Sequence, residues 1–487
     1  MTISDRASVQ IQPAAGTTIA AGAVYARRWL MLPVVLLAMF MAQFDLYVVN
    51  VALPTLQRQL GAGQGALELI VAGYAFMYAT GLITGGRLGD LFGHRTLFVG
   101  GMAAFAGASL LSGLAHSPSE LVAARLLQGL TASAMVPQVL AIITAVFPAA
   151  ERARALAWFG VTIGVGAVAG QVLGGVILNA NVLGLGWRPI FLINVPIGLV
   201  AAALAQQLLP PARGGTRPKL DPLGALLVSG GLALLLVPLA LGRTERWPLW
   251  CWVGLAAGPV VLALALLWER HSMRRGGQPL LPLGLFGDRA FNWGLGISVA
   301  AFAAFFSLLF TLTLVLQTGI GLSPLQAGLT FAPLGLAFAG ASIGGRKLVA
   351  RHGTRMVTVG LLIVAVGLVA ISVIAHEVGG GTTAADLVGP MAVVGFGNGL
   401  AVPALIGAVL SNIRAKEAGA AAGVLTTAQQ FASAAGIASL GSVFFAALGA
   451  SHGTVSYAAA LQWSACCSLV LALGGAVMST RLARPTT

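Results

Sequence analysis

The chain has 487 residues, of which 58% are hydrophobic and only 8% are charged, whereas about a quarter of the residues of an ordinary soluble domain are charged. Its formal net charge is +14, but the 27 Lys and Arg residues are spread over many short segments and form no basic stripe. This composition excludes a soluble globular protein and nucleic-acid binding, and it predicts an all-α integral membrane protein.

Fourteen apolar stretches are long enough to cross a bilayer, whose hydrocarbon core of about 30 Å needs about 20 helical residues. Residues 1–28 precede the first stretch and are predicted to form a polar cytoplasmic tail. Gly, Pro and charged residues separate the stretches. They predict membrane helices near 30–53, 68–88, 97–115, 118–140, 154–178, 189–209, 222–242, 249–268, 292–316, 325–346, 355–375, 384–410, 417–447 and 457–480.

The basic residues indicate the direction of these helices. If both termini are cytoplasmic, all but five of the 27 Lys and Arg residues fall in cytoplasmic segments, as the positive-inside rule requires. One missed helix would reverse this bias in every later loop, so the charges predict an even number of helices. The excess of Arg over Lys and the abundance of Ala and Gly are typical of high-GC bacteria. We therefore expect a multi-pass protein of a bacterial plasma (inner) membrane with both termini cytoplasmic.

The sequence contains an internal repeat. The stretch GGRLGDLFGHRTLF, Gly85 to Phe98, has a weaker counterpart in GGRKLVARHGTRMV, Gly344 to Val357. Internal duplication is typical of transporters in which two halves rock about a binding site near the membrane midplane.

Four stretches resemble the major facilitator superfamily and, within it, the fourteen-helix drug:proton antiporter family. They are FDLYVVNVALP from Phe44, GRLGDLFGHR from Gly86, RLLQG from Arg125 and GAVAGQVLGG from Gly166. The resemblance covers the chain from end to end. It implies a major facilitator fold with two six-helix bundles and two extra central helices. The expected parts are an N-terminal bundle at 29–209, cytoplasmic linkers with the two additional helices at 210–290, a C-terminal bundle at 291–480 and a cytoplasmic tail at 481–487.

Asp45 and Arg125 are charged residues inside predicted membrane helices. Counted along the helices at 1.5 Å per residue, each lies roughly 10 Å from the outer end of its helix, so the two are at similar depth. Charges inside a bilayer are costly and are usually paired. We interpret Asp45 and Arg125 as a proton-coupling pair, with a fixed ion pair that orients two helices as the alternative.

The loop after the second helix contains Gly86, Asp90, Gly93 and Arg95. Glycines suit a tight turn between two membrane helices, and the Asp and Arg side chains can hydrogen-bond across it. The resemblance implies a cytoplasmic gate, and the alternative is an ordinary positively charged loop.

The fifth helix carries small residues that allow close helix packing, and the resemblance implies that it is the antiporter-motif helix that seals the cavity. Its motif residues are Gly166, Gly170, Gln171, Gly174 and Gly175. The family's Pro after Gly170 is Gln171 here, which weakens the inference of export over uptake. Generic helix packing is the alternative for any single glycine.

The resemblance also places substrate-cavity candidates on the helices that line the central cavity. Aromatic rings at helical spacing suit large apolar molecules, and amides inside the membrane are costly unless they find partners. A carboxylate at the outer mouth of the second helix can meet a cationic substrate. The candidates are Glu68, Tyr74, Phe302, Phe306, Gln317, Asn398, Gln429 and Gln430. Packing, lipid contact or a merely interfacial position is the alternative for each.

These features predict a proton-coupled secondary transporter that exports amphipathic small molecules, such as drugs, antibiotics or a secondary metabolite, by alternating access. The sequence has no phosphate-binding loop and no zinc helix. We therefore expect no cofactor, no metal and no enzymatic activity, with the proton gradient as the energy source. The expected partners are a small-molecule substrate, protons and the lipid bilayer, and the chain is expected to act as a monomer. A proton-coupled symporter for a small solute and a non-transporting membrane sensor remain the alternatives.

Overall fold

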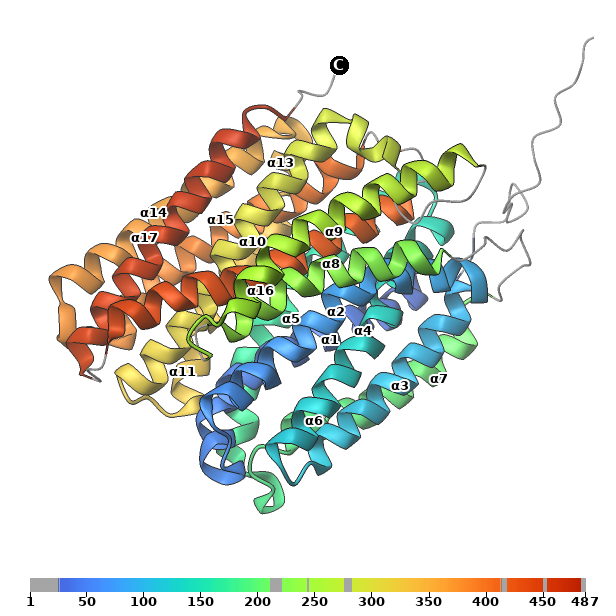
Figure 1. The fold of residues 1–487 in the computed structure, drawn as a ribbon. Helices are drawn as coiled ribbons and strands as arrows, with labels where there is room; N and C mark the ends of the chain where they lie inside the picture. Colours follow the sequence, from blue (N-terminus) through green and yellow to red (C-terminus); the bar gives the residue numbers. More distant parts are fainter. Residues whose placement is uncertain are drawn as a thin grey trace, which may run out of the picture.

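The computed structural model describes Tyr25 and residues 27–210, 221–242, 245–275, 283–411, 413, 418–449 and 453–482, apart from a few side chains within helices. In this part of the chain, 14 helical segments are long and apolar enough to cross a membrane. The predicted number of membrane helices is therefore confirmed, and all regular structure in these residues is helical (Figure 1).

The helices follow one another with short connections. The first six spans consist of α1 (Arg28–Leu60), α2 (Gln64–Phe92), α3 (His94–Leu114), α4 (Pro118–Val146), α5 (Ala149–Ala180), η1 (Val182–Gly184), α6 (Pro189–Leu192) and α7 (Asn194–Leu208). The next two are α8 (Pro222–Leu241) and α9 (Leu249–Arg274). The last six comprise η2 (Leu283–Gly287), α10 (Arg289–Leu314), η3 (Val315–Gly319), α11 (Pro324–Thr330), α12 (Ala332–Gly344), α13 (Arg346–His352), α14 (Arg355–Glu377), η4 (Gly379–Gly381), α15 (Ala384–Ser411), α16 (Ala418–Leu448) and α17 (Thr454–Ser479).

Several helices extend beyond the predicted bounds. The first was expected to end near residue 53, yet α1 continues to Leu60. Hydropathy identifies only the apolar window, whereas a helix continues until a residue adopts a backbone conformation that ends it. Gly61 does this after α1 with a φ of 67°, and Gly93 does it after α2 with a φ of 88°. Such left-handed conformations favour glycine, which has no Cβ.

Two spans are broken near a proline. Pro196 and Pro333 have no N–H to donate to the carbonyl four residues earlier, and the breaks between α6 and α7 and between α11 and α12 lie just before them. The ninth span ends differently, because α10 continues into the π-helical turn η3. Such turns are rare and frequently occur at functional sites.

The spans pack in two groups. In the first, α1 packs on α5, α2 on α4, and α3 on α4 and α7. In the second, α14 packs on α15 and α17, α10 on α16 and α17, and α12 on α15. The groups meet where α5 contacts α11 and α12 and where α2 contacts α16, and the α8–α9 hairpin lies across the second of these seams through α8 (Figure 1). This is the expected arrangement of two bundles with an additional helix pair.

The near face of the membrane is the one at which α1 begins, and the far face is the one at which α1 ends. Successive spans alternate between them, so α2 begins at the far face and α5, α8, α10 and α16 begin at the near face.

Candidate transport site

The structure brings Asp45 of α1 and Arg125 of α4 into direct contact. A guanidinium nitrogen of Arg125, Nη1, donates to Oδ2 of Asp45, and both side chains are 0% exposed. Removing one partner of a buried pair leaves an uncompensated charge, which costs about 3–5 kcal/mol. The pair therefore ties α1 to α4 inside the membrane for as long as both groups stay charged.

Two amides complete the surroundings of the Asp45 carboxylate. Its Oδ1 accepts from Nε2 of Gln128 at 2.8 Å and from Nδ2 of Asn194, on α7, at 3.0 Å. The Gln128 amide also accepts from Arg125 Nη1 at 2.8 Å and donates to Oγ of Ser109, on α3, at 2.8 Å. Three helices of the first bundle thus meet at the carboxylate, and Gln128 connects a fourth, α3, to the network. Sequence reasoning missed both amides, although an amide inside a membrane helix is itself a signal because it is costly without a partner.

Tyr74 packs against Arg125. Its ring centroid lies 4.2 Å from the guanidinium carbon, and its hydroxyl donates to the carbonyl of Ala42 at 3.0 Å. A second Arg125 nitrogen, Nε, donates to the Ile70 carbonyl at 3.0 Å. Tyr74, predicted to contact substrate, is fully buried beside the ion pair.

The gate motif lies at the near-face junction of α2 and α3. The sequence predicted a loop containing all four residues, but Gly86 and Asp90 lie in the last turns of α2 and Arg95 lies in α3, so only Gly93 is outside the helices. Asp90 lies 3.5 Å from Nη1 of Arg87 and 3.6 Å from Nε2 of His94, while Arg95 donates to the Gln206 carbonyl at the near-face end of α7. Gln138 of α4 donates to the Gly85 carbonyl at 2.8 Å. These contacts of the motif all lie within the first bundle.

Gly86 and Gly93 of this motif have different structural roles. A Cβ on Gly86 would have only Pro137 nearby, at 3.8 Å, whereas Gly93 makes the turn with its positive φ. The backbone conformation of the turn therefore favours glycine at position 93.

Four motif glycines of α5 pack against other helices. Added Cβ atoms would lie 3.0 Å from the Gln43 Cβ at Gly166, 2.8 Å from the Phe44 carbonyl oxygen at Gly170 and 2.8 Å from a Val48 methyl at Gly174. These three glycines therefore face α1. Gly175 faces the other bundle, since its Cβ would lie 2.4 Å from the Pro324 carbonyl oxygen of α11.

Gln171 lies at the same seam between α5 and α11. Its side chain is fully buried, and neither of its polar atoms has a hydrogen-bond partner among the residues described. Its carbonyl oxygen lies close to α11, where a Cβ on Gly328 would approach it to 2.6 Å. In the absence of a proline, α5 runs unbroken from Ala149 to Ala180.

A cavity of 430 Å³ lies between the bundles in the far half of the membrane. Clefts of about 300–1,000 Å³ are typical of small-molecule sites. Its walls come from the far-face portions of α1, α2, α8, α10, η3 and α16, together with Leu126 of α4. The lining residues are Leu46, Tyr47, Asn50, Leu53, Pro54, Gln57, Leu67, Leu69, Val71, Gly73, Ala75, Phe76, Leu126, Leu236, Val237, Leu239, Leu241, Phe310, Leu314, Thr318, Ala434, Ile437, Ala438, Gly441, Ser442 and Phe445.

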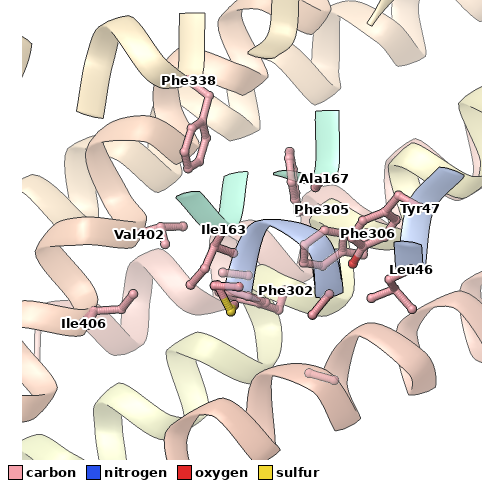
Figure 2. Packing of buried hydrophobic residues seen from close by; sticks show 14 of the residues in the cluster. Leu46, Tyr47, Ile163, Ala167, Phe302, Phe305, Phe306, Phe338, Val402 and Ile406 are labelled. Atoms are coloured by element: carbon pink, nitrogen blue, oxygen red, sulfur yellow. The ribbon is translucent and has the colours of Figure 1, made fainter. Parts of the chain in front are cut away.

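The aromatic candidates lie below this cavity. Phe306 stacks on Tyr47 with ring centroids 4.7 Å apart, and Phe302 lies 5.6 Å from Phe306. Figure 2 shows these rings and Phe305 packed with Ile163 and Ala167 of α5, in a layer that joins α1, α5 and α10. Phe302 and Phe306 border a separate void of 10 Å³, which is too small for a substrate.

The polar candidates also lie outside the cavity. Asn398 borders the small void and donates to the Val394 carbonyl of its own helix at 3.1 Å. Gln430 donates to Gln43 of α1 at 3.4 Å and so bridges the two bundles. Gln429 is buried in α16, and Gln317 lies in the π-helical turn. The side chain of Glu68 lies outside the described part of the chain. In this conformation packing closes the middle of the membrane, so none of the described candidates borders the larger cavity.

In the described residues, two bundles of six membrane-spanning helices and an additional helix pair, with an apolar cavity between the bundles and a buried ion pair beside it, define a secondary membrane transporter. The model of the Major Facilitator Superfamily matches residues 35–437. The chain belongs to this superfamily. Because the family consists of transporters, the expectation that the chain is not an enzyme is confirmed by its membership.

Curated relatives resemble the chain over most of its length. The probable actinorhodin transporter of Streptomyces coelicolor is 39% identical over 91% of this chain and 77% of that protein. The cephamycin export protein of Amycolatopsis lactamdurans is 35% identical, over 83% of this chain and 82% of that protein. The tetracenomycin C resistance and export protein of Streptomyces glaucescens is 33% identical, over 85% and 76%.

Solved structures share the fold. The proton:xylose symporter XylE superposes with a TM-score of 0.63 and 16% identity, covering 93% of this chain and 95% of its own. An auto-inhibited peptide transporter of the POT family also gives 0.63, with 20% identity and coverage of 93% and 97%. At this identity, the likeness concerns the fold alone.

Proposed function

We propose that the chain exports amphipathic small molecules, such as antibiotics, other drugs or secondary metabolites, in exchange for protons. The observation that carries this proposal is the buried pair of Asp45 and Arg125, which lies inside the membrane beside a cavity of substrate size. No cofactor is needed in this scheme, because the proton gradient supplies the energy, and one chain carries the complete pathway as a monomer.

In this proposal the near face is cytoplasmic, and both termini lie there, in a bacterial plasma membrane. The support comes from charge, because Lys and Arg concentrate in cytoplasmic loops. Arg95, Arg152, Arg346 and Arg351 all lie at the near face. The 430 Å³ cavity then occupies the outer half of the membrane, and the structure corresponds to a state from which a substrate leaves.

Protonation of Asp45 couples the binding of a proton to the contact between α1 and α4. A neutral carboxyl loses its charge-assisted bond to Arg125, although it still accepts from Gln128 and Asn194. The contact between α1 and α4 then weakens, and Arg125 keeps its bonds to Gln128 and Ile70. An ion can shift such an equilibrium only through its different affinity for the two conformations, and a buried carboxylate provides that difference.

Export as the direction is supported by the relatives whose names describe export or resistance. The energy is sufficient for concentrative export. One elementary charge that crosses a potential of 100 mV releases about 2.3 kcal/mol, which corresponds to a gradient of about 50-fold.

The variant Asp45→Asn tests the proposal, because an amide of the same shape cannot take up the proton. Inverted membrane vesicles should lose export driven by a pH gradient, while the variant still inserts in the membrane. Glu245→Gln, a change at an exposed far-face carboxylate, is the control and should export normally. Coupled export by Asp45→Asn at the normal rate would contradict the role of Asp45.

Uptake by proton symport is the second candidate function. The observation that favours it is Gln171, which stands in α5 where the antiporter motif has proline. Right-side-out vesicles with an inward proton gradient distinguish the two directions, since a symporter accumulates substrate under these conditions and an antiporter expels it.

A further inference from the structure

A histidine at the near face can take up a proton outside the Asp45 network. His94 is the first residue of α3 and stands between Gly93 and Arg95 of the gate motif. Its side chain is 33% exposed, so protons from solution can reach it. Histidine is the side chain whose charge ordinarily changes between pH 5 and 8.

The Gln138 amide of α4 determines which ring nitrogen of His94 carries a proton in the neutral state. Nε2 of this amide donates to the carbonyls of Gly85 and Ala134, at 2.8 and 2.9 Å. These two bonds orient the amide so that its Oε1 lies 2.8 Å from Nδ1 of His94. Because an amide oxygen can only accept, Nδ1 must carry a proton and donate it. In the neutral ring, Nε2 is therefore the unprotonated nitrogen.

Gly89, in the last turn of α2, makes room for this hydrogen bond. A Cβ at position 89 would overlap Oε1 of Gln138 and would lie 2.7 Å from Nδ1 of His94. Any side chain there would push the two bonded atoms apart. The absence of a Cβ thus allows the imidazole to lie against α4.

The unprotonated nitrogen of His94 faces a carboxylate. Its Nε2 lies 3.6 Å from Oδ1 of Asp90, on the last turn of α2. This distance is too long for a hydrogen bond, as expected for two atoms that both accept. A proton on Nε2 supplies the missing donor, and the contact can then become a charge-assisted hydrogen bond.

The other charged groups near the imidazole are two arginines. Nη1 of Arg87 lies 3.5 Å from the second Asp90 oxygen, Oδ2. Arg95, on the same helix as the imidazole, is directed to the Gln206 carbonyl of α7. On α4 the facing group is the neutral amide of Gln138, and α7 itself has no charged residue. Among these described groups Asp90 is the anion, and its Oδ1 is the atom that can pair with an imidazolium.

We propose that His94 is a second proton-binding site, separate from Asp45, which takes up a proton on Nε2 from the near-face solution. The imidazolium pairs with Asp90 and ties the end of α2 to the beginning of α3, while Nδ1 keeps its bond to Gln138. The gate motif thereby responds to the pH at the near face. Proton binding at this junction requires neither substrate nor Asp45, so it goes beyond the proposed function and does not depend on it.

Nitrogen NMR of the full-length protein in lipid nanodiscs, with 15N in the histidine rings, tests the proposal directly. The His94→Gln variant identifies the His94 signals by their loss. We expect a neutral ring with its proton on Nδ1 at pH 8.5, and protonation of Nε2 as the pH is lowered to 5.

Three variants test the parts of the site by the same spectra. Asp90→Asn should weaken proton binding by about 1.5- to 5-fold, which is the effect of one partly exposed ion pair. Gly89→Ala should separate Nδ1 from the amide and abolish the preference for a proton on Nδ1. Gly100→Ala on α3, where an added Cβ would meet nothing within 4 Å, is the matched control and should leave the His94 signals unchanged.

Thermal unfolding gives a second readout. The imidazolium pair with Asp90 contributes stability at acidic pH, and this contribution is lost as the pH rises and His94 becomes neutral. The Tm difference between the unmodified protein and His94→Gln should therefore grow as the pH falls from 8 to 5.5, and it should stay constant when both carry Asp90→Asn. His352→Gln is the control, at an exposed near-face histidine that bonds to the Leu348 carbonyl, and its Tm difference should not change with pH.

The outcomes separate this site from the proposed function. A His94 ring that stays neutral down to pH 5, or a neutral ring with its proton on Nε2, overturns the proposal. Proton binding that is unaffected by Asp90→Asn overturns it as well. The expected titration of His94 together with a loss of export by vesicles of the unmodified protein would count against the proposed function and leave the proton site supported.

Discussion

At the scale of single residues, the Asp45 carboxylate accepts hydrogen bonds from three side chains that belong to two helices other than its own. Arg125 neutralises its charge, and the two amides fill the remaining positions around it. In a low-dielectric interior the hydrogen bonds of such a network strengthen one another. The energetic role of each amide is therefore measurable separately from the ion pair.

Asn194→Leu should destabilise the protein, because Asp45 Oδ1 loses a donor whose bond to a charged group is worth about 1.5–3 kcal/mol. The measurement is the Tm in detergent micelles. Ser112→Ala is the control. Its hydroxyl makes only a 3.3 Å contact with the Gln128 amide and a local bond to the Ala108 carbonyl, so its loss should cost less. Equal Tm values for Asn194→Leu and the unmodified protein would show that the amide is not part of the network.

Glu151 forms a second ion pair, at the near face. Arg28 donates to its two oxygens at 2.7 and 2.8 Å, and the Trp29 indole donates at 3.0 Å. These bonds hold the pKa of Glu151 below its ordinary value of 4.5. The contribution to stability is therefore present above pH 4.5 and disappears as the pH falls through the lower pKa of the folded state.

Glu151→Gln should accordingly lower the Tm slightly at pH 7, with a difference that vanishes at acidic pH where the unmodified Glu151 is protonated too. Thermal unfolding followed between pH 7 and pH 3 measures this difference. A Tm difference that stays constant over the whole range would mean that charge at Glu151 has no part in the tie between α1 and α5.

At the scale of elements, the two faces of α5 pack against different helices. Gly166, Gly170 and Gly174 bring α1 close within one bundle, whereas Gly175 brings α11 close across the seam. Contacts within a bundle persist when the bundles rock, but contacts across the seam must form and break. Gly175 is thus the glycine of this motif that is most directly connected with conformational change.

Gly175→Ala should reduce transport, because the added Cβ would lie 2.4 Å from the Pro324 carbonyl oxygen, and backbone atoms must shift to accept it. Gly107→Ala on α3 is the matched control, since its Cβ would meet nothing within 4 Å. That change should keep transport and, like other Gly-to-Ala changes inside helices, stabilise the helix by up to about 1 kcal/mol. Initial rates of export by vesicles measure both, and equal rates would argue against a mobile α5–α11 seam.

At the scale of the whole molecule, the bundles touch at the near face, along the midplane and, where Gly175 of α5 meets Pro324 of α11, also in the far half, in which the cavity lies between α1, α2, α10 and α16. The near-face contact includes Arg346, whose guanidinium carbon lies 5.1 Å from the ring centroid of Trp158 on α5. Arg346 belongs to the weaker copy of the gate motif. The first copy makes its observed contacts inside its own bundle, so the second copy is the one that links the two bundles.

Arg346→Met should shift the protein away from this conformation, because it removes a cation–π contact of about 0.5–2 kcal/mol and so changes the populations by about 2- to 30-fold. Nitroxide labels at Val182 and Val378, which are exposed at the far face, report its opening by electron–electron resonance distances in a variant without native cysteines. Lys347→Met, at the exposed neighbouring position, is the control. Identical distance distributions for Arg346→Met and the unmodified pair would refute the link.

The number and order of the spans could be predicted from the sequence, because the apolar length that a bilayer requires is a local property of the chain. The turn at Gly93 and the two membrane-embedded charges could also be identified from the sequence. A tight turn is a local feature, and a charge inside the membrane is costly in any tertiary arrangement. The rotation of each helix about its axis and the way the bundles meet are not local. It is therefore the packing of the helices that brings Gln128 and Asn194 to Asp45, turns Gly175 toward α11, and places the cavity beside α8 rather than beside the predicted aromatic and amide residues.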